Sequence, residues 1–536
     1  MAVVKKFEKI SNVIIFSFLS LFFASKLYAI LNLSPVYWVD FFTDDAYYYF
    51  SITENILKNG FSGVSAPLET NGYQPFLLLL LLFGGAFGLS APVVSICVQA
   101  IFSYLFVYVS SRINQILPAL VTLVIFNFSF EGMESILIPF FAILYFRAKN
   151  WVGRGIIGVM LFLSRLDTLA VIIAFDLFRN DKSIRGLLHW AIIISVAIFY
   201  FLINYYYYGS VVPVSGLVKS IGGNFFQNNF AILQMINAGK YFVIPGVIIC
   251  MLGRFGFLSL RYEPELKASL ISFFIVGFYY WSFSSWPLWP WYFWSVTLTA
   301  FFVLAEFWFQ FRFKSVEVNN YIKVFSLAFI AIIFVKFFNS LFSMSSVFPG
   351  IDFKYKINES FGVENVRLIS RLNSIGLNSG TVAMGDRAGS FVFFMPKSLH
   401  FFHTEGLTAD INYQRALSSG AGRQFFDKMN VNYLVVDREK YIESNETIGV
   451  IEPVQIVLPS NKSTYIICFK FNSIVDQVRY SDQKRLVLDV NGRVDCPVEI
   501  LNKYKNLRSS FNGIRYYSLP SEYKHGLYRA IHSMMD

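Results

Sequence analysis

Long apolar runs recur through the first 345 residues of this 536-residue chain, and they constrain its fold more than any other feature. The first run covers residues 10–33 and is interrupted only by Lys26. The others lie near residues 75–89, 92–110, 115–130, 133–147, 155–165, 168–178, 187–207, 241–260, 267–285, 291–311 and 321–344. About 20 apolar residues in a helix cross a bilayer, so the pattern predicts a multi-span α-helical membrane protein.

The composition agrees with burial in lipid. Hydrophobic residues make up 55% of the chain and charged residues only 15%, whereas a soluble domain of this length needs more polar surface. The net charge of +11 does not by itself predict nucleic acid as a partner, because Lys and Arg between spans mark the cytoplasmic face and no basic stripe with interleaved aromatics is present. No Cys/His cluster indicates zinc. Cys468 and Cys496 can form a disulfide if their region is extracytoplasmic.

Basic residues predict the topology. Lys5, Lys6 and Lys9 precede the first run and place the N-terminus in the cytoplasm. A cleaved signal peptide is the alternative, since LYA at residues 27–29 has a suitable small-residue ending. The later basic turns all face the cytoplasm if the run at 75–89 is interfacial or re-entrant, with half-length helices on either side of Arg165. Parity then predicts about 11 transmembrane helices and an outer C-terminus.

The chain changes character at about Ser346. Beyond it, strand-like segments stand at residues 431–436 (VNYLVV), 465–471 (YIICFKF) and 485–490 (RLVLDV). This pattern predicts two domains. Residues 1–345 form the transmembrane domain, with an outer loop at about 34–75, and residues 346–536 form a soluble α+β extracytoplasmic domain.

Two adjacent carboxylates in the outer loop are the sharpest candidates for chemistry. Asp44 and Asp45 follow the first span and begin a helical segment that ends at Gly60. A carboxylate at the membrane surface can take a proton from an acceptor hydroxyl, or it can hold a divalent cation such as Mg²⁺ or Mn²⁺. Asp44, the residue nearer the membrane exit, is slightly preferred as the base. The simpler alternative is that one of the two caps the helix that follows.

Further polar residues reach the same outer face. Glu134, in EGMES at 131–135, can join a metal site with the two aspartates or orient an acceptor, or it can simply favour a helix dipole. Arg165 and Asp167, in SRLDT at 164–168, can form a structural ion pair. Lys219, with Arg165 as a second candidate, can neutralise a lipid-linked phosphate, the alternative being a lysine that snorkels to headgroups.

An aromatic stretch, WPLWPWYF at 286–293, is expected on the same face. Its tryptophans and Tyr292 are interpreted as an interfacial belt, with a sugar-stacking platform as the alternative.

These residues stand in segments that resemble the outer loops of the GT-C superfamily, multi-span glycosyltransferases that use lipid-phosphate sugars. The similarity is to a bacterial branch that is distantly related to arabinofuranosyltransferases and protein mannosyltransferases. Its elements are DDAYY at 44–48, TNGYQP at 70–75, GMES at 132–135, RLD at 165–167 and a G-x₃-P-x-S-x₃-K loop at 209–219. The C-terminal part departs from the branch pattern, because Glu405 precedes Gly406 where the branch has Asp.

The resemblance implies a polyprenyl-phosphate sugar as donor and inversion at the sugar carbon. It implies Asp44 or Asp45 as the catalytic base, Glu134 as a second acidic residue, and Lys219 and Arg165 at the phosphate. Asp167, Asn71 and Tyr73 are counted with the substrate-binding residues. The acceptor is expected to be a cell-envelope glycan, lipid or protein, and the location a bacterial inner membrane.

Two rival functions remain open from the sequence. A transporter or flippase of lipid-linked sugars would suit a polytopic chain with buried charge, although no inverted repeat is visible. A scaffold in an envelope complex is the other, and it leaves the acidic outer loop unexplained. No GxxxxGK[ST] or GxGxxG sequence stands between a strand and a helix, which argues against a nucleotide-sugar donor.

Overall fold

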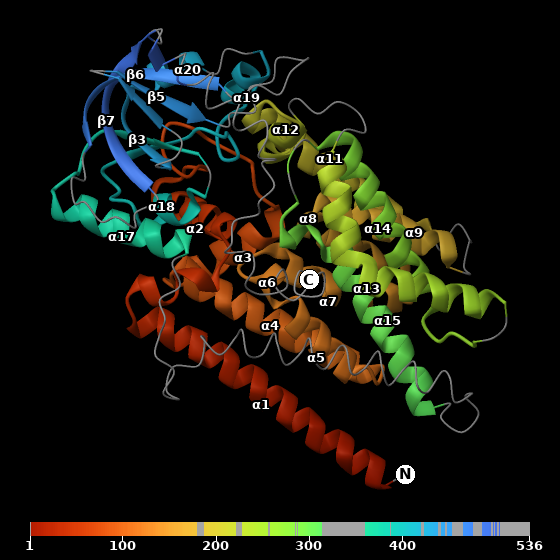
Figure 1. Ribbon diagram of the computed structural model, residues 1–536. Helices are drawn as coiled ribbons and strands as arrows, with labels where there is room; N and C mark the ends of the chain where they lie inside the picture. The colour runs from red at the N-terminus through yellow and green to blue at the C-terminus, as the bar shows by residue number, and fades with distance from the viewer. Residues whose placement is uncertain are drawn as a thin grey trace.

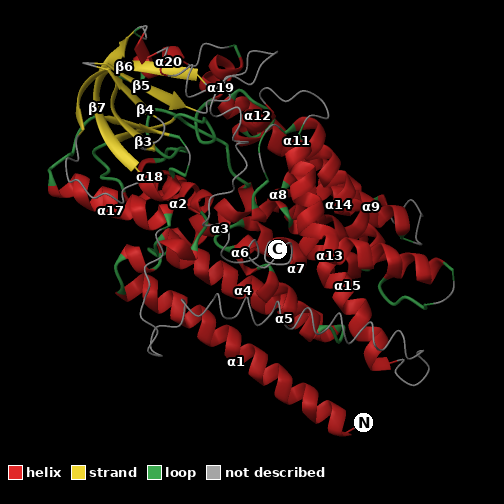
Figure 2. Ribbon diagram, in the orientation of Figure 1, coloured by secondary structure: helices red, strands yellow, loops and turns green. Residues whose placement is uncertain are grey.

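The computed structural model describes residues 2–503, apart from internal gaps of which the longest is 314–359, and it leaves out residues 504–536. Helices dominate up to residue 313, and a mixed β-sheet with short helices follows from residue 361 (Figure 1 and Figure 2). The run at 321–344, the domain boundary near 346 and Cys496 lie outside the described residues. The division into two domains and the disulfide therefore stay predictions.

The helical part runs in chain order through α1 (Ala2–Asn32), α2 (Asp44–Asn59), α3 (Pro75–Ala86), α4 (Ala91–Arg112), α5 (Ile116–Ile125), α6 (Asn127–Phe130), α7 (Leu137–Arg147), α8 (Trp151–Ser164), α9 (Leu169–Phe178), α11 (His189–Tyr208), α12 (Val214–Ser220), α13 (Asn229–Arg254), α14 (Glu263–Phe283) and α15 (Trp294–Phe313). Short 3₁₀ turns are η1 (Pro35–Tyr37), η2 (Val39–Phe41), η3 (Glu134–Ile136), η4 (Leu166–Thr168) and η5 (Pro290–Tyr292).

Five described helical segments are long and apolar enough to cross a membrane: Ile15–Asn32, Ala91–Arg112, His189–Tyr208, Ala231–Arg254 and Glu263–Phe283. Three shorter apolar helices accompany them: α3, α5 and α8. The chain is therefore a largely helical membrane protein, while the total of about 11 spans stays a prediction.

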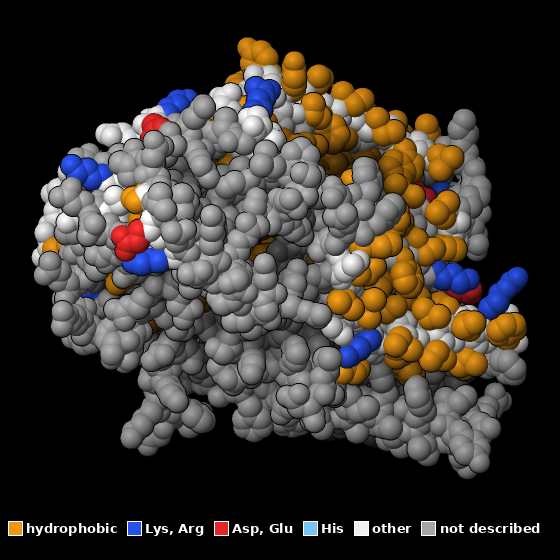
Figure 3. Space-filling model, turned by 45° about the horizontal axis from the view of Figure 1, so that its top comes forward, with side chains coloured by type: hydrophobic (Ala, Val, Ile, Leu, Met, Phe, Trp, Pro, Cys, Tyr) orange, Lys and Arg blue, Asp and Glu red, His pale blue; other side chains and the backbone are white. Residues whose placement is uncertain are grey.

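The surface of α11 shows where lipid contacts the protein. Its side chains include Phe199, which is 65% exposed, and Tyr206, which is 81% exposed. Hydrophobic side chains gather over one flank of the molecule, with few charges among them (Figure 3). Such a large exposed apolar surface is stable only against another apolar phase.

Helices α2, α8 and α11 end where the sequence predicted, α2 and α11 at a glycine and α8 at the polar segment that begins with Arg165. Gly60 after α2 and Gly209 after α11 both adopt left-handed backbone, with φ of 64° and 66°. The helices α8 and α9 are short and lie on either side of Arg165, as expected. The break between them puts a charged segment, residues 165–168, among the helices.

The sheet contains β1 (Thr381–Met384), β2 (His400–His403), β3 (Val431–Asp437), β4 (Tyr441–Ser444), β5 (Thr447–Glu452), β6 (Tyr465–Ile474) and β7 (Arg485–Val494). Its order is β2-β1-β3-β7-β6-β5-β4. Strand β1 is parallel to β2 and β3, whereas the pairs from β3 to β7 and onward are antiparallel. Strands β3, β6 and β7 cover the three segments predicted from sequence.

Among the described residues, four helices accompany the sheet: α17 (Phe361–Ser374), α18 (Gly389–Phe394), α19 (Ile411–Ser418) and α20 (Arg423–Lys428). Helix α18 connects β1 to β2 and lies beside α2 (Figure 1). The backbone N–H of Phe401 donates to Ser65 Oγ at 2.9 Å, and Ser360 Oγ donates to Asp40 at 2.7 Å. The sheet is thus packed directly on the predicted outer loop.

Candidate functional site

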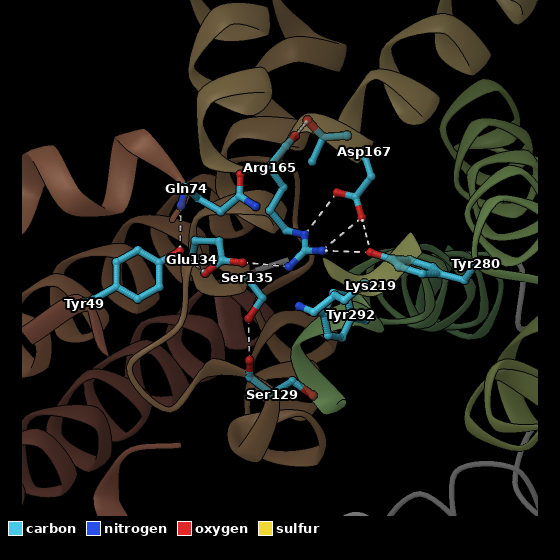
Figure 4. A network of polar contacts seen from close by, with 11 residues as sticks. Tyr49, Gln74, Ser129, Glu134, Ser135, Arg165, Asp167, Lys219, Tyr280 and Tyr292 are labelled. Carbon is cyan, nitrogen blue, oxygen red and sulfur yellow. Dashed lines mark hydrogen bonds and ion pairs between the residues drawn. The ribbon is translucent and has the colours of Figure 1, made fainter. Parts of the chain in front are cut away.

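A buried arginine organises the centre of the candidate site (Figure 4). Arg165 is 4% exposed and donates from Nη1 to Glu134 at 2.7 Å. Its Nε and Nη2 donate to the two carboxylate oxygens of Asp167, at 3.0 and 3.1 Å. Nη2 also donates to the Tyr280 hydroxyl at 3.2 Å. The guanidinium therefore has two carboxylate partners in a geometry that holds it rigidly.

Glu134 reaches this centre because a glycine lets its loop pack closely on α2. Gly132 has φ of 76°, and a Cβ there would lie 2.6 Å from the Cβ of Ala46. Glu134 is buried, with one carboxylate oxygen on Arg165 and the other accepting from the Tyr49 hydroxyl at 3.3 Å. Tyr49 in turn accepts from the backbone N–H of Gln74 at 2.8 Å. The GMES segment is thereby tied to α2 and to the TNGYQP segment.

A second cation, Lys219 on α12, meets Arg165 across an aromatic ring. Lys219 Nζ lies 4.9 Å from the centroid of the Tyr292 ring and is hydrogen-bonded to its hydroxyl. The Arg165 guanidinium carbon lies 4.8 Å from the same centroid. Tyr292 is itself buried and packs edge-on against Tyr280. The Tyr292 ring therefore makes cation–π contacts with both Arg165 and Lys219.

The charge of Lys219 is favoured by its surroundings. Burial acts to lower the pKa of Lys219, but Tyr292 and the carboxylate of Asp45 act to raise it. The resulting pKa lies above the ordinary lysine value. The ammonium is therefore positive at any physiological pH, and Asp45 lies near enough to interact with it.

Asn71 and Tyr73 hold the outer loop in place. Asn71 is 1% exposed, donates from Nδ2 to Asn204 of α11 at 3.0 Å, and accepts from the Val214 N–H at the start of α12 at 2.9 Å. The Tyr73 hydroxyl lies 3.0 Å from Ser62 Oγ and 3.1 Å from the Tyr208 hydroxyl. Asn71 thus fixes the helix that carries Lys219. Direct substrate contact by these two residues stays a prediction.

The two aspartates occupy different environments. Asp44 accepts from the N–H groups of Gly389 and Ser390 at 2.7 and 2.9 Å, and from Ser390 Oγ at 3.1 Å, where α18 begins. Burial raises the pKa of Asp44, and those backbone donors partly offset the rise. Its carboxylate joins α2 to the start of α18, the helix between β1 and β2. Thr43 is the N-cap of α2, so neither Asp44 nor Asp45 caps the helix.

Asp45 lies in the first turn of α2 and is half-buried. Its charge acts on two members of the network, raising the pKa of Lys219 and of Tyr49. The carboxylate of Asp45 and the ammonium of Lys219, which lie far apart in the sequence, therefore interact electrostatically in the folded chain.

The predicted metal site does not assemble within the described part of the chain. No group of three or more His, Cys, Asp or Glu side chains there is placed to hold a metal ion. Glu134 is bonded to Arg165, and Asp44 is bonded to the start of α18. A role for Mg²⁺ or Mn²⁺ stays a prediction.

Several residues of the network were missed by sequence reasoning. Tyr49 directly follows the DDAYY segment, but it is one of three consecutive tyrosines at 47–49, and nothing in the sequence singled it out. Tyr280 lies inside an apolar helix, and Tyr292 was assigned to an interfacial belt. Only their hydroxyls, each bonded to a charged group, mark them as part of the site.

Comparison with known proteins leaves the family open. No family model matches the chain, and no curated protein matches it. A solved structure, ArnT from Cupriavidus metallidurans bound to undecaprenyl phosphate, is similar at 12% identity and a TM-score of 0.47, over 89% of this chain and 98% of that one. A TM-score below 0.5 does not establish a shared fold, so the function has to be inferred from the site.

Proposed function

We propose that the chain is a membrane glycosyltransferase that transfers a sugar from a polyprenyl-phosphate donor to a hydroxyl of an acceptor, with inversion. One observation carries the proposal. Four of the five motif segments that suggested the function, together with Tyr49 directly after the DDAYY segment, converge in one connected network. Its links are Tyr49–Gln74, Tyr49–Glu134, Glu134–Arg165, Asn71–Val214 and the Tyr292 ring shared by Arg165 and Lys219.

Lys219 is the proposed phosphate ligand. Its positive charge is supported by its surroundings, and its hydrogen bond goes to the phenol of Tyr292. A lipid-linked phosphate that gains charge as it leaves is stabilised by a fixed cation. Arg165 has two carboxylate partners, so it acts as the positioning residue that holds Tyr292 and Glu134 in place.

Asp45 is the proposed base. The acceptor hydroxyl oxygen forms a bond to the sugar carbon, the bond from that carbon to the phosphate oxygen breaks with its electron pair, and the proton passes to the Asp45 carboxylate. The products are the glycosylated acceptor and the polyprenyl phosphate. Asp44, which the sequence slightly favoured, is a poorer candidate because three hydrogen bonds from α18 already occupy its carboxylate.

The proposed setting is the non-cytoplasmic side of a bacterial inner membrane, with the N-terminus cytoplasmic and the acceptor a cell-envelope glycan, lipid or protein. The arrangement of basic turns supports this orientation. A topology reporter fused near Asp536 is expected to read outside. Activity of a cytoplasm-only reporter there contradicts the topology.

The test is transfer of radiolabelled sugar by the purified chain in lipid nanodiscs, from a polyprenyl-phosphate sugar to an envelope extract. A glycosyltransferase consumes the donor and labels the extract. A transporter or flippase, tested in sealed vesicles, moves the intact donor across the bilayer. A scaffold does neither, and either of these last two results contradicts the proposal.

A further inference from the structure

A lysine inside the first membrane span has no part in the proposed transfer step. Lys26 belongs to the span Ile15–Asn32 and lies about 9 Å along the helix from its last residue. It is 1% exposed, and its Nζ lies 4.8 Å from the ring centroid of Phe22 and 5.4 Å from that of Phe41. Such burial excludes a lysine that snorkels to the headgroups. A buried charge at this depth is costly, so it is expected to have a charged partner and a function.

Glu131, in the connection between α6 and η3, is the carboxylate that interacts with Lys26. Burial raises the pKa of Glu131, whereas the charge of Lys26 lowers it. Asp40 in η2 also acts on Glu131 and raises the same pKa. The side chain of Glu131 is held from its own segment, because Asn127 Nδ2 donates to its Oε1 at 3.1 Å. Glu131 therefore interacts with one charge on α1 and with another on η2.

The main chain of Glu131 holds the first turn of α2. The backbone N–H of Thr43, the N-cap residue, donates to the Glu131 carbonyl oxygen at 3.0 Å. The N–H of Ala46 in turn donates to the Thr43 carbonyl oxygen at 3.0 Å. The next residue, Gly132, packs so closely that its Cβ would lie 2.6 Å from the Cβ of Ala46. Asp45 stands between Thr43 and Ala46, so a shift of Glu131 would move the proposed base.

We infer that Lys26 and Glu131 form a charge pair that fixes the start of α2 relative to the first span, and that both are positioning residues for Asp45. The role of Asp45 rests on the proposed function, whereas the hold on α2 does not depend on transfer. Lys26 is buried and Glu131 is half-buried, so water screens their interaction only in part. Removing one partner leaves the other charge without it, whereas removing both leaves no such charge.

The first measurement is hydrogen–deuterium exchange of residues 40–50 in the full chain in nanodiscs, which reports how firmly the start of α2 is held. Lys26→Met keeps the length of the side chain without its charge, and Glu131→Gln keeps the acceptor for Asn127. Each single variant should exchange about tenfold faster or more, and the double variant should return toward the natural rate. Lys58→Met, which removes a lysine from an exposed ion pair on α2, is the matched control and should change nothing.

The second measurement is transfer from a polyprenyl-phosphate sugar, with kcat and the donor KM determined separately and thermal unfolding followed in parallel. Each single variant should lower kcat of the folded protein by about tenfold, because the base is displaced. The donor KM should stay the same, because Lys219 is not moved. The double variant should recover kcat. A merely structural pair would lower the unfolding temperature and leave kcat of the folded protein unchanged.

Faster exchange in both single variants that the double variant reverses supports the charge pair. The inference is overturned if both single variants exchange at the natural rate, or if the double variant exchanges or unfolds no better than they do. The same exchange pattern in a chain that consumes no polyprenyl-phosphate sugar supports the pair, and only the proposed function then fails. Unchanged kcat in the single variants of an active transferase overturns the positioning role alone.

Discussion

Replacing each outer-loop aspartate by asparagine separates a structural carboxylate from a catalytic one. In Asp44→Asn one carboxylate oxygen becomes an amide NH₂. The N–H groups of Gly389 and Ser390 bind different oxygens, at 2.7 and 2.9 Å, so one of them then faces a donor. A buried N–H left without its acceptor costs about 1–3 kcal/mol, and the lost charge weakens the remaining bond. We expect a loss of about 2 kcal/mol in stability, with transfer retained at 25 °C.

Asp45→Asn should behave in the opposite way. Asparagine keeps the size of the side chain, and losing the Asp45 charge near Lys219 should lower stability by less than the about 2 kcal/mol expected for Asp44→Asn. It cannot accept the acceptor proton, and loss of a general base lowers the rate by about 10²–10⁴-fold. The expected result is therefore an active but less stable Asp44 variant and a stable but inactive Asp45 variant.

The assay combines two measurements on each purified variant in nanodiscs. Thermal unfolding reports stability, and single-turnover transfer from a defined polyprenyl-phosphate sugar reports chemistry apart from donor binding. The reasoning is refuted if Asp45→Asn keeps full single-turnover transfer. It is also refuted if Asp44→Asn loses transfer by more than 100-fold while keeping natural stability, since the base would then be Asp44.

Three further predictions use the same preparation. Lys219→Ala should raise the donor KM and lower transfer by about 100-fold with unchanged folding, and unaltered donor kinetics would contradict it. Gly389→Ala should destabilise the chain by about 2 kcal/mol or more, because the added Cβ would lie 2.0 Å from the Asp44 carbonyl oxygen. Gly277→Ala is the matched control, because a Cβ there would lie 3.9 Å from its nearest neighbouring atom. Equal unfolding midpoints for the two variants would refute the contact. Burial lowers the pKa of His403 to about 3, so below pH 6.5 the unfolded chain binds a proton at this histidine that the folded chain does not bind. The free energy of unfolding should therefore fall by about 1.4 kcal/mol per pH unit from pH 6.5 toward pH 4. His403→Gln should flatten this slope, and parallel slopes in the two proteins would contradict the prediction.

The sequence was sufficient for the class of fold and for the strands that could be recognised by alternation. Apolar runs predicted the membrane helices, and Gly60 and Gly209 predicted helix ends, because these signals are local. The segments at 431–436, 465–471 and 485–490 were recognised as strands for the same reason. Short helices such as α7 and α9 were located, but whether they cross the membrane depends on their neighbours.

The partners of each polar side chain were decided only by the tertiary structure. The sequence placed Asp44 and Asp45 side by side and could not say that the first is bonded to Gly389 and Ser390 while the second acts electrostatically on Lys219. It likewise treated Tyr292 as a belt residue. A carboxylate or phenol has the same local signal whatever it binds, and its role depends on long-range contacts that desolvate it and supply its charge partner.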